Sequence, residues 1–301
     1  MTENKPFQIK EEAIAPDWSK VGIVEMNRWT KFTLCVATLA TPLVIASTPA
    51  QAGIGDLLVA PTRIVLDGRK GAEIILNNIG EEPATYRVSV EFRRMTADGG
   101  LVDVAAPTAD DQKAADMVVY APRKVVLAPH QPQAIRIAAR PPQGLPDGEY
   151  RVHLLFRAIP PANPVVQAAA AEPARGLHFQ LIPVYGVTIP VIVRLGNLQA
   201  TAGIANVHLE QKDGKPFVSL DLSRSGERST FGEVRVLKAG VKNPIAIQKA
   251  VAVYTEIGVR HLAVPIDDSQ KVAAAGPVTV QYVETFDDGS HVIAETQAVL
   301  R

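Results

Sequence analysis

The chain has 301 residues, of which 47% are hydrophobic, so it is long enough for two domains and can bury a core in each. Lysine plus arginine and aspartate plus glutamate number 31 each, so the formal net charge is zero. This balance argues against a general affinity for nucleic acid or an anionic membrane, because such binding needs a summed basic field.

The first segment, residues 1–52, is predicted to be a targeting signal. The basic stretch Met26–Lys31 precedes an apolar run over residues 32–46, and small residues follow as far as Ala52. This order is typical of a secretory signal peptide cleaved after Ala52, and it favours Met26 as the true start. The apolar run is too short for a membrane span, so we expect no stable membrane anchor. Cys35 is the single cysteine, and its place in this run leaves the exported chain without a thiol.

The residues after Ala52 predict an all-β fold. Tyr86–Phe92 alternates apolar and polar side chains, which is the period of a half-buried strand. Similar short runs are separated by turn pairs such as Asp213-Gly214, and we find no amphipathic helix of useful length. Several short strands with regular turns indicate antiparallel sandwiches. Three acidic pairs are interpreted as turn or loop residues rather than calcium ligands: Asp110-Asp111, Asp267-Asp268 and Asp287-Asp288.

A domain boundary is predicted near residue 196, where Gly196-Asn197 offers a turn. Before it, the alanine- and proline-rich segment 160–176 predicts a long loop, and the strand-like run Leu177–Leu195 follows. Pro183 and Pro190 interrupt this run, and because proline lacks a backbone N–H, the run must lie partly at a sheet edge. The predicted domains are 53–196 and 197–301.

Five segments occur in the order found in the periplasmic chaperones of the chaperone–usher pathway, which cap pilus subunits. They are Thr62–Gly68, Lys124–Pro129, Leu145–Tyr150, Phe156–Pro161 and the run 177–194. The chain resembles this family, although Leu145–Tyr150 lacks the arginine and serine of the family's Leu-Pro-x-x-Arg-Glu-Ser. The resemblance implies two immunoglobulin-like β-sandwich domains set at an angle, with a cleft that holds the subunit's C-terminal carboxylate.

The resemblance also implies site residues. The family's first-strand arginine matches Arg63, the expected carboxylate anchor, whereas the family's lysine falls on Pro190, where this sequence departs from the pattern. Arg194, or a residue of the second domain, is the alternative basic contact. The expected subunit-binding edge strand presents Leu177, Phe179, Leu181, Pro183, Tyr185, Val187 and Ile189. The competing interpretation is that Arg63 faces solvent and that these apolar side chains fill the sandwich's own core.

The resemblance further implies a periplasmic location and two partners, a pilin-like subunit and an outer-membrane usher, with a self-capping homodimer left open. No cofactor is expected. The six histidines are dispersed without metal-ligand spacing, and no Gly-x-Ser-x-Gly elbow is present, so an enzyme is not expected. The alternative function is a secreted adhesin or structural protein of tandem immunoglobulin-like domains, and a carbohydrate-active enzyme is more remote.

Overall fold

The computed structural model describes residues 56–160, 184–267, 273, 275–286 and 289–301, which belong to one compact unit. Most of these residues lie in β-strands, and the only helix among them is α1 (Ala109–Met117), which confirms the all-β prediction. No helix in this part of the chain is long and apolar enough to cross a membrane. The predicted signal segment and the loop beyond Pro160 lie outside the described residues.

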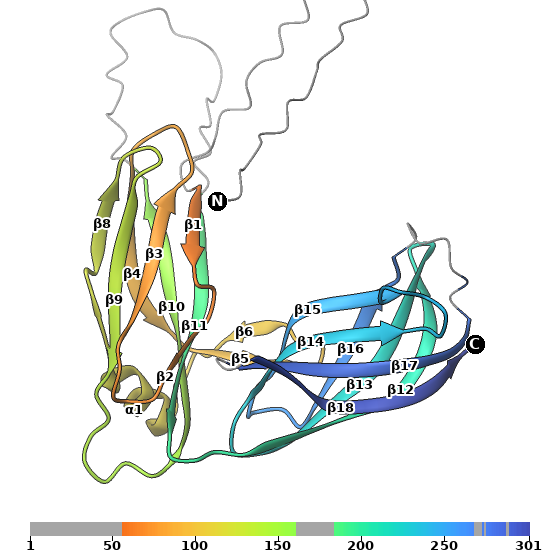
Figure 1. Cartoon of the computed structure of the whole chain (residues 1–301). Helices are drawn as coiled ribbons and strands as arrows, with labels where there is room; N and C mark the ends of the chain where they lie inside the picture. The colour runs from red at the N-terminus through yellow and green to blue at the C-terminus, as the bar shows by residue number, and fades with distance from the viewer. Residues whose placement is uncertain (1–55, 161–183, 268–272, 274, 287–288) are drawn as a thin grey trace, which may run out of the picture. The chain divides into compact units, whose positions relative to one another are not determined.

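The first sandwich is built from two sheets, and all of their strands except β7 are labelled in Figure 1. One sheet has the order β1-β3-β9-β7, formed by β1 (Leu57–Ala60), β3 (Ala72–Asn78), β9 (Pro132–Ala139) and β7 (Val118–Ala121). The other has the order β2-β11-β10-β4-β8, formed by β2 (Ile64–Leu66), β11 (Gly186–Leu195), β10 (Gly148–Ile159), β4 (Ala84–Glu91) and β8 (Lys124–Leu127). All pairings are antiparallel except that of β2 with β11.

The core of the first sandwich lies between its two sheets. Alternate strand residues point inward, as in β4, where Tyr86 and Val88 are buried. Phe156 on β10 and Ile135 on β9 are fully buried as well. Burying a side chain of this size stabilises the fold by about 1.5–3 kcal/mol relative to leaving it exposed. The alternation that predicts strands in the sequence is therefore the same pattern that fills this core.

The helix α1 corrects one expectation from the sequence. Asp110 and Asp111 lie in the first turn of α1 rather than in a loop. The Thr108 hydroxyl accepts a hydrogen bond from the Asp111 backbone N–H at 3.2 Å, and the Asp111 carboxylate accepts one from the Thr108 backbone N–H at 2.8 Å. This reciprocal capping box satisfies donors that a helix start leaves free. Arg94, on the short hairpin of β5 (Arg93–Met95) and β6 (Leu101–Asp103), also donates to Asp111, at 2.6 Å.

The second sandwich follows β11 in the chain and also has two antiparallel sheets (Figure 1). Its first sheet is β12 (Ala200–Lys212), β13 (Lys215–Gly226) and β16 (Val259–Pro265), in that order. Its second sheet has the order β15-β14-β17-β18, formed by β15 (Ala246–Val253), β14 (Thr230–Leu237), β17 (Gly276–Phe286) and β18 (Gly289–Leu300). Every second residue of β14 is buried, and fully buried Tyr282 of β17 lies in the same core.

A third, small apolar cluster joins residues of both sandwiches. Ile192 comes from β11 of the first sandwich and Met95 from the β5–β6 hairpin that precedes α1, whereas Ala252 and Tyr254 come from the second sandwich. Ile192 points away from the core between the first two sheets, yet it is fully buried, because residues of the second sandwich cover this face of β11. The chain therefore uses one part of the outer face of the first sandwich as an internal contact.

Candidate functional site

Most of β11 lacks a strand partner on one side among the described residues. Strand β10 pairs with the whole length of β11, from Gly186 to Leu195, whereas β2 covers only Val191–Val193 on the opposite side. Among the described residues, the stretch 186–190 therefore has an open edge, where backbone groups that point away from β10 have no strand to pair with. Pro190 lies in this stretch, which agrees with the prediction that the run lies partly at a sheet edge.

Arg63 lies beside the end of this open edge because the chain changes sheets just before β2. Strand β1 pairs with β3 in one sheet, and β2 pairs in parallel with β11 in the other. Ile64 stands opposite Val191, so continuing this register by one residue places Arg63 opposite Pro190. Arg63 and Pro190 are therefore neighbours in the structure.

The guanidinium of Arg63 is stacked but not hydrogen-bonded. Its Cζ lies 4.5 Å from the ring centroid of Phe231 on β14, a cation–π contact. Its Nη1 is buried without a hydrogen-bond partner among the described residues. Burial, and then the charge of Arg194, lowers the pKa of Arg63 from its ordinary value. A buried cation with free donors favours an anion that can accept hydrogen bonds from it.

Three other arginines also have a buried nitrogen without a partner, and comparison with them singles out Arg63. Arg151, Arg224 and Arg260 each donate a hydrogen bond from another guanidinium nitrogen. The guanidinium of Arg63 donates no hydrogen bond among the described residues, so its N–H groups are free to bind a ligand. This makes Arg63 the best candidate for a binding residue.

A cavity of about 730 Å³ opens beside Arg63. Residues around β2 line most of it, and Phe231 and Thr285 of the second sandwich complete the wall. Arg63, Lys70 and Arg194 are its three cationic residues, and Asp67 is its single acidic one. The volume is within the range of ordinary ligand pockets, and the charge of its walls favours an anionic group.

Arg194 also lines the cavity, but its side chain has partners. Its Nε donates to Glu149 Oε2 at 3.0 Å, and its Nη2 donates to the backbone carbonyl of Ser229 at 2.9 Å. The same Glu149 oxygen accepts hydrogen bonds from the backbone N–H and the hydroxyl of Ser229, both at 2.9 Å. Through these hydrogen bonds, Arg194 of β11 and Glu149 of β10 are connected to Ser229 of the second sandwich.

The residues of the expected edge strand fall in different environments. Leu177, Phe179, Leu181 and Pro183 lie outside the described residues. Tyr185 is 54% exposed, just before β11. Val187 is half-buried against the core of the first sandwich, and Ile189 belongs to that core with 1% exposure. Ile189 can therefore offer a partner its backbone, while its side chain fills its own sandwich.

Sequence reasoning missed a second polar group on the outer face of β10. Arg151 donates to Glu256 of the second sandwich at 3.0 Å, and its guanidinium lies 3.8 Å from the centroid of Tyr254. His153, two residues further along β10, is 1% exposed, and neither of its ring nitrogens has a hydrogen-bond partner within the described part of the chain. In the structure three residues in a row, Val152–Leu154, are buried, which breaks the alternation of a strand with one solvated face.

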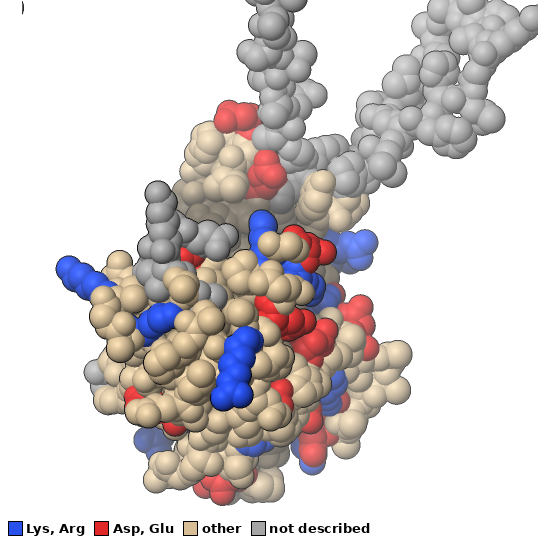
Figure 2. Space-filling view, turned by 90° about the vertical axis from the view of Figure 1, so that its right-hand side faces the viewer, with Lys and Arg blue, Asp and Glu red and all other residues tan. Residues whose placement is uncertain are grey.

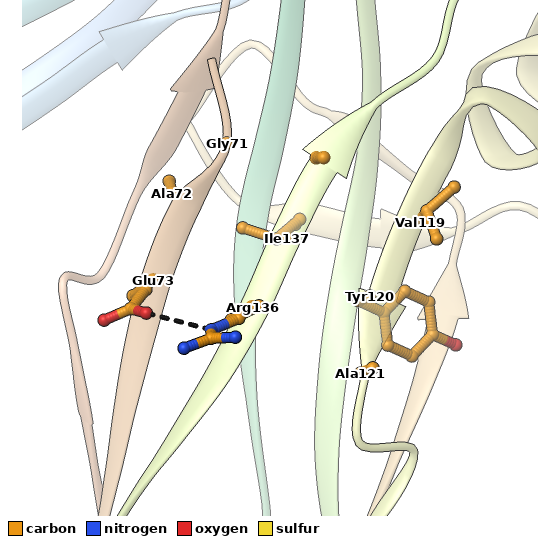
Figure 3. A pocket seen from close by; sticks show the side chains of 9 residues that line it. Gly71, Ala72, Glu73, Val119, Tyr120, Ala121, Arg136 and Ile137 are labelled. Carbon is orange, nitrogen blue, oxygen red and sulfur yellow. Dashed lines mark hydrogen bonds and ion pairs between the residues drawn. The ribbon is translucent and has the colours of Figure 1, made fainter.

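A second hollow, of about 500 Å³, lies on the sheet of β3, β9 and β7. Figure 3 shows Val119 and Ile137 on its surface and the ion pair of Arg136 with Glu73 at one side. Its walls are mostly apolar and hold no unpaired charge, unlike those of the Arg63 cavity. Elsewhere, positive and negative side chains are interspersed on the face drawn in Figure 2. Across the described part of the chain, no three His, Cys, Asp or Glu residues are grouped as metal ligands.

Comparison with known proteins gives similarity in structure only. No family model matches the chain, and no curated protein matches it. Among solved structures, the CupB2 chaperone of Pseudomonas aeruginosa has 12% identity over 81% of this chain and 100% of that chain, with a TM-score of 0.42. The E. coli chaperone DraB has 17% identity over 81% and 96%, with a TM-score of 0.42. A pre-assembly complex of the chaperone CsuC with the tip adhesion subunit CsuE of Acinetobacter baumannii has 11% identity over 81% and 97%, with a TM-score of 0.41.

Proposed function

We propose that this protein is a periplasmic chaperone that caps a pilin-like subunit by adding a strand to it. The observation that carries the proposal is the open edge of β11 at residues 186–190, which ends beside the unpartnered guanidinium of Arg63. A subunit that lacks one strand exposes backbone donors and acceptors, and an edge strand can satisfy them by continuing the sheet. The open edge of β11 and the incomplete subunit are thus complementary, because each can satisfy the unpaired backbone groups of the other.

Arg63 fixes the end of the bound subunit in this proposal. A strand that pairs along residues 186–190 reaches Arg63 at the Pro190 end, next to the cavity. A terminal carboxylate there accepts charge-assisted hydrogen bonds from the guanidinium, which are stronger than neutral ones. Phe231 holds the guanidinium in place from the other side, so the anchor is already oriented before the subunit arrives. Delivery of the subunit to an outer-membrane usher is part of the proposal and follows the family resemblance.

The test is capture of the subunit by the full chain in the cells that produce it. A tagged chain is purified from the periplasm, and the proteins that accompany it are identified by mass spectrometry. We expect a one-to-one complex with a small secreted β-protein, which Arg63→Met abolishes. Because Arg63 is a partly buried cation without hydrogen bonds to the described residues, Arg63→Met is not expected to lower the melting temperature, so loss of the complex reports binding.

Arg136→Met is the matched control, because it removes an arginine from the exposed face of another sheet. It should keep the complex. Purification of the chain alone, from cells shown to assemble the fibre, would contradict the chaperone function and favour a secreted adhesin or structural protein. Equal capture by Arg63→Met and the original chain would leave strand addition standing but remove the carboxylate anchor.

A further inference from the structure

The β5–β6 hairpin, here named the strap (residues 93–103), belongs to neither sheet of the first sandwich. Its two strands pair with each other, and no other described strand pairs with them. None of its residues belongs to the core of either sandwich, although Arg94 ties its first strand to Asp111 of α1. A two-stranded hairpin is marginally stable at best in water, so the strap depends on contacts beyond its own.

The second sandwich supplies these contacts. At the tip of the strap, the carbonyl of Ala97 accepts a hydrogen bond at 2.7 Å from the backbone N–H of His261, on β16 at the end of its sheet. On β5, the backbone N–H of Met95 donates to Glu256 Oε1 at 2.7 Å. The Met95 side chain is 7% exposed and belongs to the same small apolar cluster as Tyr254. The strap therefore runs from the end of β4 to a sheet edge of the other sandwich.

The tip of the strap is shaped for a close approach to β16. Two backbone hydrogen bonds close the turn, from the Gly99 N–H to the Thr96 carbonyl at 2.8 Å and from the Thr96 N–H to the Gly100 carbonyl at 2.9 Å. Gly99 has a φ of +84°, and a Cβ there would overlap the guanidinium of Arg260 on β16. That guanidinium is itself held, because its Nη1 donates to the carbonyl of Ala252 at 2.6 Å. A side chain at position 99 is thus incompatible with the docked tip.

The strap is also connected to the Arg63 site through the small apolar cluster. Phe231, whose ring stacks on the guanidinium of Arg63, packs against the cluster that contains Met95 and Tyr254. Withdrawing Met95 would open this cluster to water and remove dispersion contacts that stabilise it. The position of the strap and the position of the ring that orients Arg63 are therefore coupled through contiguous packed side chains.

We propose that the strap opens and closes over the second sandwich as a unit, and that capture of the subunit at Arg63 requires the closed state. The inference rests on the proposed function. The strap can open while both sandwiches stay folded, because its residues contribute to neither core and β6 is exposed throughout. In the open state, Phe231 loses its support and the guanidinium loses its orientation. By linkage, a bound strand that favours the closed state must also make opening of the strap less frequent.

Hydrogen exchange of single amides, followed by NMR on the full chain, measures the opening. The amide of His261 reports on the strap, because its acceptor is the carbonyl of Ala97. We expect Gly99→Ala and Met95→Ala each to speed its exchange by about 10-fold or more. The amide of Leu262, within the pairing of β16 with β13, should keep its protection. Unchanged exchange of His261 in both variants would overturn the opening of the strap.

Gly144→Ala is the matched control for the backbone strain of Gly99→Ala. Gly144 also has a positive φ, of +78°, but an added Cβ would meet no atom of the described residues within 4 Å. The exchange of the His261 amide should therefore stay at its original rate in this variant. An equal acceleration in Gly144→Ala would assign the effect to general strain and overturn the opening of the strap.

Binding of a peptide to the full chain tests the role of the strap in capture. The probe is a hexapeptide of alternating valine and threonine with fluorescein on its N-terminus, followed by fluorescence anisotropy. The same peptide with proline in place of each threonine lacks the N–H groups for strand pairing and is the negative control. We expect Gly99→Ala and Met95→Ala to weaken binding of the probe by about 5-fold or more, and Gly144→Ala to leave it unchanged. Saturating probe should slow the exchange of the His261 amide in the original chain.

The outcomes separate the strap from strand addition. If Gly99→Ala and Met95→Ala speed the exchange of His261 but bind the probe with the original affinity, the role of the strap in capture is overturned and strand addition stands. If the original chain binds the probe and the proline peptide equally, or binds neither, strand addition at β11 falls, and the role of the strap in capture falls with it.

Discussion

The buried His153 predicts a specific dependence of stability on pH. Burial, followed by the charges of Arg151, Arg93 and Arg94, lowers the pKa of His153 from 6.5 to about 3, and Glu256 opposes this only in part. The imidazole is therefore neutral in the folded protein, whereas in the unfolded chain it takes up a proton near pH 6.5. Because the unfolded state binds the additional proton, the folded state loses stability as the pH falls below 6.5.

The magnitude follows from the difference between the two pKa values. One pKa unit corresponds to about 1.4 kcal/mol, so the fall from 6.5 to about 3 gives an upper limit of about 5 kcal/mol. Between pH 6.5 and pH 4.5 the loss is about 2–3 kcal/mol. The Arg151 ion pair holds the pKa of Glu256 below 4.5 against the effect of burial, so that carboxylate contributes at lower pH. The window from 6.5 to 4.5 therefore isolates the histidine.

The assay is urea denaturation of the full chain at a series of pH values from 7.5 to 4.5. The free energy of unfolding should fall in the original chain and stay nearly constant in His153→Leu, which removes the titrating group and two unpartnered buried nitrogens. His153→Gln should behave in the same way if leucine disturbs packing. His130→Gln, at an exposed position, should keep the original slope. A slope that survives in both His153 variants would refute the reasoning.

Three further predictions concern stability, each measured by urea or thermal denaturation. Gly232→Ala should destabilise the protein by about 1–3 kcal/mol or more, because the new Cβ would meet the Val283 carbonyl oxygen of the paired strand, whereas Gly258→Ala has open space and should be neutral. Arg228→Met should cost about 3–5 kcal/mol, since it leaves the Glu284 carboxylate, now paired at 2.6 Å, as a buried charge, and a loss under 1 kcal/mol would contradict this. Thr108→Ala should cost about 1 kcal/mol by removing the cap of α1, and Thr108→Ser should recover most of it.

Much of the strand content could be predicted because alternation survives in the linear sequence. The segment Lys124–Pro129 begins with strand β8 (Lys124–Leu127), and Tyr86–Phe92 overlaps β4. In both strands, the buried side chains follow the period of two. The helix α1 was missed because it is short and weakly amphipathic, and its start is marked only by the Thr108–Asp111 spacing.

The contacts of the candidate site could not be predicted, because they join residues far apart in the sequence. Arg63 was assigned from the resemblance, but nothing in the sequence places it over the ring of Phe231. The pattern of β10 shows the same limit. Alternation predicts Arg151 and His153 on a solvated face, whereas residues of the second sandwich cover them. Local patterns indicate which face of a strand points outward, but not what covers that face.

Comparison with the other partly buried guanidinium groups of the molecule favours the interpretation of Arg63 as a ligand-binding residue over that of a packing defect. Arg94 is paired with Asp111, Arg194 with Glu149 and Arg228 with Glu284, while Arg224 and Arg260 donate to backbone carbonyls, so each of these partly buried guanidinium groups has an acceptor within the chain. A single additional acidic side chain in the cavity of about 730 Å³ could have supplied an acceptor to Arg63 as well. Because a partly buried cation without a hydrogen-bond acceptor lowers stability, the position of Arg63 beside an open strand edge supports the proposal that a carboxylate of a partner binds there.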